Sequence, residues 1–126
     1  MADQKRILVV DDEPDMVDWL TTFLEDNGFA TLSAESGAEC FAKARSEHPD
    51  LITLDVSMDD ESGLKALRKL QETEETSGIP IIMVTGVSTD VKRFIERSKH
   101  LEMPAAFMEK PVERDDLLKK IRELLT

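Results

Sequence analysis

Short apolar runs recur along the 126-residue chain and alternate with segments of helical periodicity. The runs predict strands at residues 7–10, 29–34, 51–54, 79–84 and 105–108. Most of them are nearly continuous stretches of Ile, Leu, Val and Met, without a regular alternation of apolar and polar positions. This pattern is typical of parallel strands whose two faces are both covered.

Helical repeats fill the segments between these runs. They predict helices from Pro14 to the Asn27-Gly28 pair, from Ser36 to about residue 47, from Gly63 to about residue 71, over residues 89–99 and over residues 117–125. Ser36 and Glu39 fit a capping box at the start of the second helix. Val91, Phe94 and Ile95 form the apolar set of the fourth helix.

The alternation of five strands with five helices predicts the fold class. Right-handed crossovers between parallel strands place helices on both faces of one sheet. We therefore expect an α/β flavodoxin-like (βα)5 fold, a doubly wound parallel five-stranded sheet with strand order 2-1-3-4-5. In this order the switch point lies between the first and third strands, and ligands bind beyond the carboxyl ends of the strands there.

Polar residues follow four of the predicted strands. Asp11 and Asp12 come after residues 7–10, Asp55 after 51–54, Thr85 after 79–84, and Lys110 shortly after 105–108. Because the carboxyl ends of parallel strands meet at one edge, we expect these five side chains to converge. Carboxylate oxygens suit Mg²⁺, and a carboxylate beside a cation is a candidate nucleophile toward phosphorus. A hydroxyl and an ammonium would bind the phosphoryl oxygens.

Each of these residues also has an ordinary explanation when taken alone. The acidic pair before Pro14 could cap a helix and match its dipole. Thr85 could be a β-branched strand residue and Lys110 a surface lysine. The five together, in one layer of strand ends, favour a metal and phosphoryl site.

Composition narrows the function classes. The net charge of −11 argues against binding to a nucleic-acid backbone, which needs clustered Lys and Arg. The only apolar stretch near the N-terminus is too short for a signal sequence or a membrane span. The single Cys40 excludes an internal disulfide and is expected to be a buried structural thiol. We therefore expect a cytoplasmic protein.

The order and spacing of these pieces resemble the receiver domain of response regulators in bacterial two-component signalling, of the single-domain chemotaxis-regulator type. The matching segments cover essentially the whole chain and are residues 7–14, 51–58 with Gly63, 84–86 and 110–111. The resemblance implies one receiver domain over residues 1–126 with no output domain in this chain. It also implies a cis bond between Lys110 and Pro111.

The resemblance implies an acceptor and a metal site. Asp55 would accept a phosphoryl group from the phosphohistidine of a sensor histidine kinase or phosphotransfer protein, or from a small phosphodonor. The metal would be Mg²⁺, with Mn²⁺ as a substitute. Asp12 would be a direct ligand and Asp11 would act largely through water, together with Asp55 and the backbone carbonyl of Ser57.

The resemblance also implies a switch. Thr85 and Lys110 would contact the phosphoryl group, and Phe107 would be the aromatic switch residue, although a plain core aromatic is the alternative. The surface that changes would be the fourth helix, fifth strand and fifth helix, with Val91 and Ile95 either partly on it or in the core. The downstream protein target is not identified, and a phosphorylation-dependent dimer stays open.

Two features depart from the family pattern. Asp59 stands where the family commonly has proline, and Asp60 and Glu61 follow it. Such an acidic loop could raise metal affinity or repel an anionic donor, but we interpret it as solvated. Ser57 and Val87 occupy positions that influence hydrolysis of the acyl phosphate, and neither side chain obviously positions a water molecule. The hypothesis is slow self-dephosphorylation.

Two other functional classes are less well supported. An aspartate-based phosphohydrolase usually carries a second aspartate two residues after its nucleophile, whereas Ser57 stands there. A flavodoxin-like binding module with an idle site would leave the full residue set unexplained, and no glycine-rich phosphate loop is visible. We expect a signalling switch, with self-phosphorylation and self-dephosphorylation as its only enzymatic activity.

Overall fold

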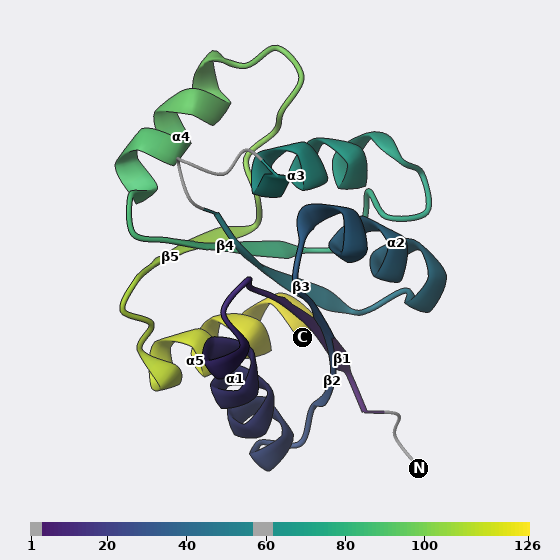
Figure 1. Cartoon of the computed structure of the whole chain (residues 1–126), viewed down its shortest axis with the longest axis vertical. Coiled ribbons are helices and arrows are strands. Elements are labelled where there is room, and N and C mark those ends of the chain that lie inside the picture. Colours follow the sequence, from purple (N-terminus) through teal and green to yellow (C-terminus); the bar gives the residue numbers. More distant parts are fainter. Residues whose placement is uncertain (1–3, 57–61) are drawn as a thin grey trace.

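The computed structural model describes residues 4–56 and 62–126 of the chain. Strands and helices alternate as predicted: β1 (Arg6–Val10), α1 (Pro14–Asp26), β2 (Ala30–Ala34), α2 (Gly37–Glu47), β3 (Leu51–Asp55), α3 (Ser62–Glu72), β4 (Ile81–Thr85), α4 (Ser88–Arg97), β5 (Ala106–Glu109) and α5 (Arg114–Leu125). The strands pair in parallel in the order β2-β1-β3-β4-β5 (Figure 1). The flavodoxin-like prediction is confirmed.

The sheet separates two helical layers. α1 and α5 cover one face, and α2, α3 and α4 cover the other (Figure 1). Side chains of β1 alternate between these layers, because Ile7 and Val9 pack with α1 and α5 whereas Leu8 and Val10 pack on the opposite side. A strand that is covered on both faces needs apolar residues at every position, which explains the continuous runs.

Local signals set the element boundaries. α1 ends before Gly28, whose φ of +93° is a conformation that glycine adopts without strain. The Ser36 hydroxyl accepts a hydrogen bond from the Glu39 amide at 3.1 Å, as the capping box predicts. The strand predicted at 79–84 instead begins at Ile81, because Pro80 has no amide hydrogen for the sheet ladder.

The cysteine is buried as predicted. Cys40 lies on α2 with no exposed surface, and burial raises the pKa of its thiol to about 12. The group is therefore protonated, and inert as a nucleophile, in the folded protein at neutral pH. Across the described part of the chain, no helix combines the length and hydropathy that a membrane span needs.

The apolar residues predicted for α4 divide between the core and the surface. Val91 and Ile95 are buried in the core, so neither contributes to the surface of α4. Phe94, predicted to share their face, is 50% exposed. α4 is thus attached to the sheet by a narrow stripe of side chains one helical turn apart, with Ser88 buried at its start.

Candidate functional site

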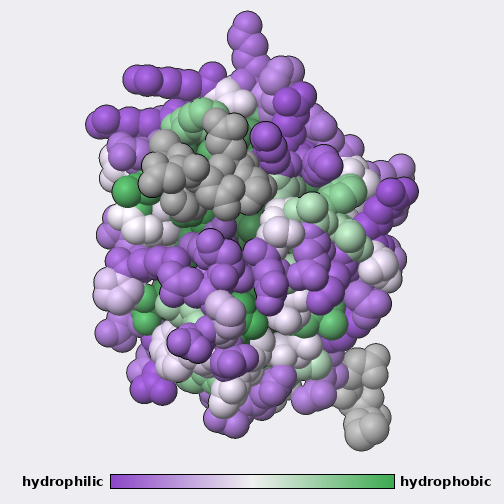
Figure 2. Space-filling model, viewed as in Figure 1, coloured by the Kyte–Doolittle hydropathy of each residue, from purple (hydrophilic) through white to green (hydrophobic). Residues whose placement is uncertain are grey.

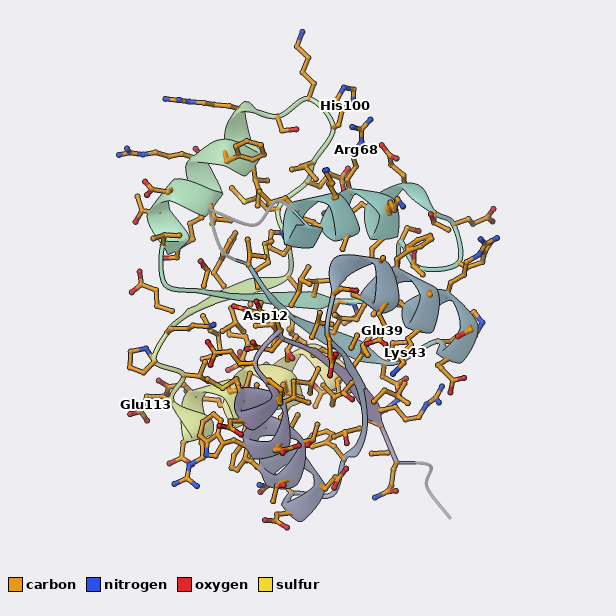
Figure 3. All side chains as sticks on the ribbon, in the orientation of Figure 1. Asp12, Glu39, Lys43, Arg68, His100 and Glu113 are labelled. Atoms are coloured by element: carbon orange, nitrogen blue, oxygen red, sulfur yellow. The ribbon has the colours of Figure 1, made fainter. Side chains whose placement is uncertain are left out.

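The predicted strand-end residues do converge. A cleft of about 550 Å³ lies at the carboxyl edge of the sheet, and its lining includes Asp11, Asp12, Asp55, Thr85 and Lys110. These residues follow or end β1, β3, β4 and β5, which are neighbours in the sheet. Asp12 lies near the centre of the view in Figure 3, beyond the end of β1.

Three carboxylates crowd together in this cleft. Asp11, Asp12 and Asp55 each place one oxygen within 4.8 Å of the other two. Asp11 is buried, Asp55 half-buried and Asp12 exposed, so the group spans the wall and the mouth of the cleft. All the donors are oxygen atoms, and a cluster of carboxylates in which one is exposed suits a hard divalent cation that keeps some of its water. The residues present therefore fit Mg²⁺.

The local fold fixes Asp11. Its Oδ1 atom accepts a hydrogen bond from the amide of Glu13 at 2.9 Å, which closes the turn between β1 and α1. Burial raises the pKa of the Asp11 carboxyl, and the charge of Asp55 raises it further, against the opposing effects of the Glu13 amide and Lys110. An ionised Asp11 is thus costly in the protein without a cation.

Lys110 supplies positive charge to this cluster. Its Nζ atom lies 2.8 Å from Asp55 Oδ1 and 3.9 Å from Asp11 Oδ2. Burial lowers the pKa of the ammonium, but the hydrogen bond to Asp55 and the charges of Asp55 and Asp11 outweigh it, so the pKa is raised overall. Lys110 is therefore a cation at any physiological pH. The bond between Lys110 and Pro111 is cis, as expected.

Thr85 connects the cleft to the loop after β4. Its side chain is fully buried, and Oγ1 accepts a hydrogen bond from the Val87 amide at 3.1 Å. The hydroxyl keeps its own hydrogen for a further acceptor. The Thr85 carbonyl accepts from the Lys110 amide at 3.0 Å, so the backbones that carry the hydroxyl and the ammonium are bonded to each other.

Gly63 has a steric reason for its place. A Cβ atom there would lie 3.0 Å from Val56 Cγ2 and 3.1 Å from the Asp55 carbonyl oxygen. Any larger residue would require the first turn of α3 or the end of β3 to shift by a few tenths of an ångström. Glycine therefore allows the close approach of α3 to the backbone that carries Asp55.

Phe107 lies outside the residues that line the cleft. It is half-buried on β5 and packs against the core shared by α2, α3 and α4. The Lys92 ammonium on α4 lies 5.0 Å from the centroid of its ring, a cation–π contact. The structure therefore shows a partly buried core aromatic with a lysine from α4 over it.

Some expectations from the sequence differ from the structure, and others concern residues that the structure does not describe. For the helix-capping alternative, the N-cap position of α1 is Glu13, whose side chain makes no capping hydrogen bond, and neither Asp11 nor Asp12 occupies that position. The predictions for Ser57 and for the acidic loop at 59–61 concern residues outside the described part of the chain. Two further parts of the chain line the cleft and were not predicted from the sequence: residues 35–37 before and at the start of α2, and Asp90 on α4. Residues 35–37 follow β2, so the rule that ligands bind at strand ends would have identified them.

An acidic triad beside a paired lysine, at the switch point of a doubly wound sheet, is typical of a phospho-accepting site. The response regulator receiver domain family matches residues 7–122, and the chain belongs to this family. It is similar to the protein PilH of Pseudomonas aeruginosa, with 37% identity over 120 residues that cover 95% of this chain and 97% of PilH. The chain is thus a signalling domain of the two-component type.

Solved structures of receiver domains share this fold. A CheY-like receiver domain protein from Methanospirillum hungatei superposes with a TM-score of 0.79 at 32% identity, over 98% of this chain and 94% of that one. The receiver domain of a sensor histidine kinase from Pseudomonas aeruginosa superposes with a TM-score of 0.83 at 22% identity, over 98% of both chains. That structure has a magnesium ion coordinated in its active-site cleft.

Proposed function

We propose that Asp55 accepts a phosphoryl group and that its phosphorylation switches a protein-binding surface. The observation that carries the proposal is the 2.8 Å ion pair between Lys110 and Asp55 inside the carboxylate triad. A lone carboxylate repels an anionic phosphoryl donor, whereas one paired with an ammonium at the mouth of a cleft does not. The donor would be the phosphohistidine of a histidine kinase or phosphotransfer protein, or a small phosphodonor.

Asp11, Asp12 and Asp55 would hold Mg²⁺, or Mn²⁺ in its place, since their oxygens already lie within 4.8 Å of one another. The bound cation would supply charge neutralisation for the carboxylates and the incoming phosphoryl oxygens. The relative with magnesium in its cleft supports this placement. The resemblance to receiver domains also implies a ligand from the Ser57 carbonyl.

The transfer itself is a displacement at phosphorus. A carboxylate oxygen of Asp55 forms the new P–O bond while the P–N bond of the donor breaks, and the imidazole nitrogen keeps that electron pair. Lys110 is 30% exposed, so its ammonium can turn from the carboxylates to a phosphoryl oxygen. Thr85 donates its free hydroxyl hydrogen to another oxygen. The product is an acyl phosphate on Asp55.

The hydrogen bonds of Thr85 carry the signal outward. Moving its hydroxyl toward the phosphoryl group breaks the 3.1 Å bond from the Val87 amide and shifts the loop before α4. Phe107 then turns inward, which removes the ring from beneath Lys92. The surface formed by α4, β5 and α5 changes as a result, and a partner protein or a second copy of the chain reads it.

Intact-mass analysis tests the proposal. Wild-type protein incubated with Mg²⁺ and acetyl phosphate is expected to gain one phosphoryl group, and Asp55→Asn none. Asp18→Asn, an exposed aspartate on α1, is the matched control and should label like wild type. Chelation with EDTA should abolish labelling and Mn²⁺ should restore it.

Three results would contradict this function. They are equal labelling of Asp55→Asn, no labelling in excess donor, and turnover of many equivalents of a generic phosphoester, which would indicate a phosphohydrolase. Loss of label after removal of the donor tests the slow self-dephosphorylation predicted from Ser57 and Val87. A phosphoryl half-life of seconds would refute that part alone.

A further inference from the structure

The outer side of α4 carries an exposed aromatic residue in an unusual setting. Phe94 is 50% exposed and lines an open hollow of about 620 Å³. The other residues around the hollow are Asp90, Arg93, Arg97 and Ser98, and we call these five residues the α4 outer surface. Isolated exposed apolar side chains are common, but an aromatic ring set in a hollow between arginines resembles the centre of a protein interface.

Phe94 lies on a different flank of α4 from Lys92, the residue that faces β5. Successive helical residues are about 100° apart, so Lys92 and Phe94 point in directions about 200° apart around α4. Lys92 reaches the ring of Phe107 on β5. Phe94 therefore lies on the flank of α4 turned away from β5, and a role for it goes beyond the proposed function.

The charge of this region opposes that of the whole chain. Residues 88–100 carry four Lys or Arg and two Asp or Glu, whereas the chain has a net charge of −11. Side chains with nitrogen tips project from α4 (Figure 3), and elongated hydrophilic side chains extend from the same upper-left part of the molecule (Figure 2). This positive region favours an acidic ligand.

Arg93 and Arg97 are positioned so that both could bind the same acidic ligand. Arg93 and Arg97 are one helical turn apart, a spacing at which like charges destabilise a helix. Within residues 4–56 and 62–126 neither forms an ion pair. Guanidinium groups bind carboxylates through two parallel hydrogen bonds, and a separation of about 5.4 Å matches two acidic residues one turn apart on a partner helix.

We propose that the α4 outer surface binds an acidic helical segment of a partner protein. An apolar side chain of that segment fills the hollow against Phe94, and carboxylates on either side pair with Arg93 and Arg97. A nucleic-acid strand fits less well, because two arginines on an acidic protein provide no track for a phosphate backbone. Asp90 also lines the hollow and could pair with a basic residue of the partner next to its acidic segment.

Peptide binding tests this assignment. The probe is a fluorescein-labelled 12-residue helical peptide with two glutamates one turn apart and a leucine between them in the sequence, and its control has glutamine for each glutamate. We expect the acidic peptide to bind at least about tenfold more tightly by fluorescence anisotropy, with a marked loss at high salt. Amide NMR shifts should map to Arg93, Phe94 and Arg97.

Variants on the exposed surface locate the site. Arg93→Glu with Arg97→Glu, and Phe94→Ala, should each weaken binding about tenfold or more, with unchanged melting temperatures. Arg122→Glu, an exposed arginine on α5 in the opposite layer, should bind like wild type. Asp55→Asn should bind the peptide normally, so failure here and failure of the phosphorylation test are independent.

Other outcomes would overturn the inference. Equal binding of the two peptides, an equal loss in Arg122→Glu, or shifts that map elsewhere would exclude an acidic ligand at this surface. Tighter binding of a single-stranded oligonucleotide that the double variant abolishes would assign the surface to nucleic acid. Self-association by analytical ultracentrifugation that the double variant abolishes would assign it to a second copy of the chain.

Discussion

Asp11→Asn is expected to stabilise the protein in the absence of divalent cations. Asp11 is 4% exposed and shares its oxygen cluster with two other carboxylates. Asparagine keeps the side-chain oxygen that accepts from the Glu13 amide, so the turn between β1 and α1 is retained. The substitution removes the buried charge and little else.

The distances set the magnitude. Two like charges at the 4.8 Å limit of the cluster repel by about 0.9 kcal/mol in water and about 3.5 kcal/mol at an effective dielectric constant of 20. Asp11 loses two such repulsions, with Asp12 and Asp55. It also loses its attraction to Lys110 at 3.9 Å, about 1.1 to 4.3 kcal/mol on the same scale. Because Asp12 is exposed and screened, we expect a net gain of about 1–2 kcal/mol.

Thermal unfolding in EDTA measures this gain as a rise of about 3–8 °C in Tm. Millimolar Mg²⁺ should stabilise wild type more than the variant and so close the gap, because the cation binds the folded state only. Asp18→Asn is the control for loss of a surface charge. Equal or lower stability of Asp11→Asn in EDTA would refute the electrostatic reasoning.

The gain should also depend on pH in a fixed direction. Burial raises the folded-state pKa of Asp11 above its ordinary value of 3.8. Because the folded protein holds this proton more tightly than the unfolded chain, protonated Asp11 adds to the free energy of unfolding. This contribution is complete below pH 3.8 and is lost as pH rises through the folded-state pKa. The advantage of Asp11→Asn is therefore largest near neutral pH and disappears in acid. A constant advantage down to acid pH would contradict this cause.

Further predictions concern three other positions. Gly63→Ala should cost about 1 kcal/mol by urea unfolding and slow labelling by acetyl phosphate, because its methyl group crowds the end of β3 at 3.0 Å. Unchanged stability and rate would refute this. Ser88→Ala should cost about 1 kcal/mol by losing the 2.7 Å bond to the Glu109 carboxylate, whereas the exposed Thr89→Ala should cost less. The Cys40 thiol should react with iodoacetamide only when the protein unfolds. Because its pKa is raised by burial, the free energy of unfolding should fall as pH rises from 9.0 toward about 12. Rapid labelling of the native protein would contradict its burial.

The fold was predictable because the central strands have a clear apolar pattern in the sequence. β1, β3 and β4 are covered on both faces, and each shows a continuous apolar run in the sequence. The edge strands β2 and β5 are only partly buried, and their patterns were correspondingly weaker. Boundaries moved by a residue or two where a proline or a turn interrupted the ladder, as at Pro80.

The candidate site was predictable for a topological reason. Parallel strands bring their carboxyl ends to one edge, so the residues that follow them must be neighbours whatever their separation in sequence. The grouping of Asp11, Asp55 and Lys110 follows from that rule. The helix-capping alternative for the acidic pair also fitted the sequence, and only the structure shows that Glu13 holds the N-cap position of α1 while Asp11 accepts a hydrogen bond from the Glu13 amide.

The amino-acid sequence by itself therefore determined the order of elements, the strand order and the residues that meet at the strand ends. Tertiary structure decided which side chains are buried, which are exposed and which contact one another. The set Val91, Phe94 and Ile95 fits a helix face in any rotation, and only the packing of α4 on the sheet shows that Phe94 is left exposed. Burial and charge spacing depend on neighbours from distant segments, and periodicity along one segment carries no information about those neighbours.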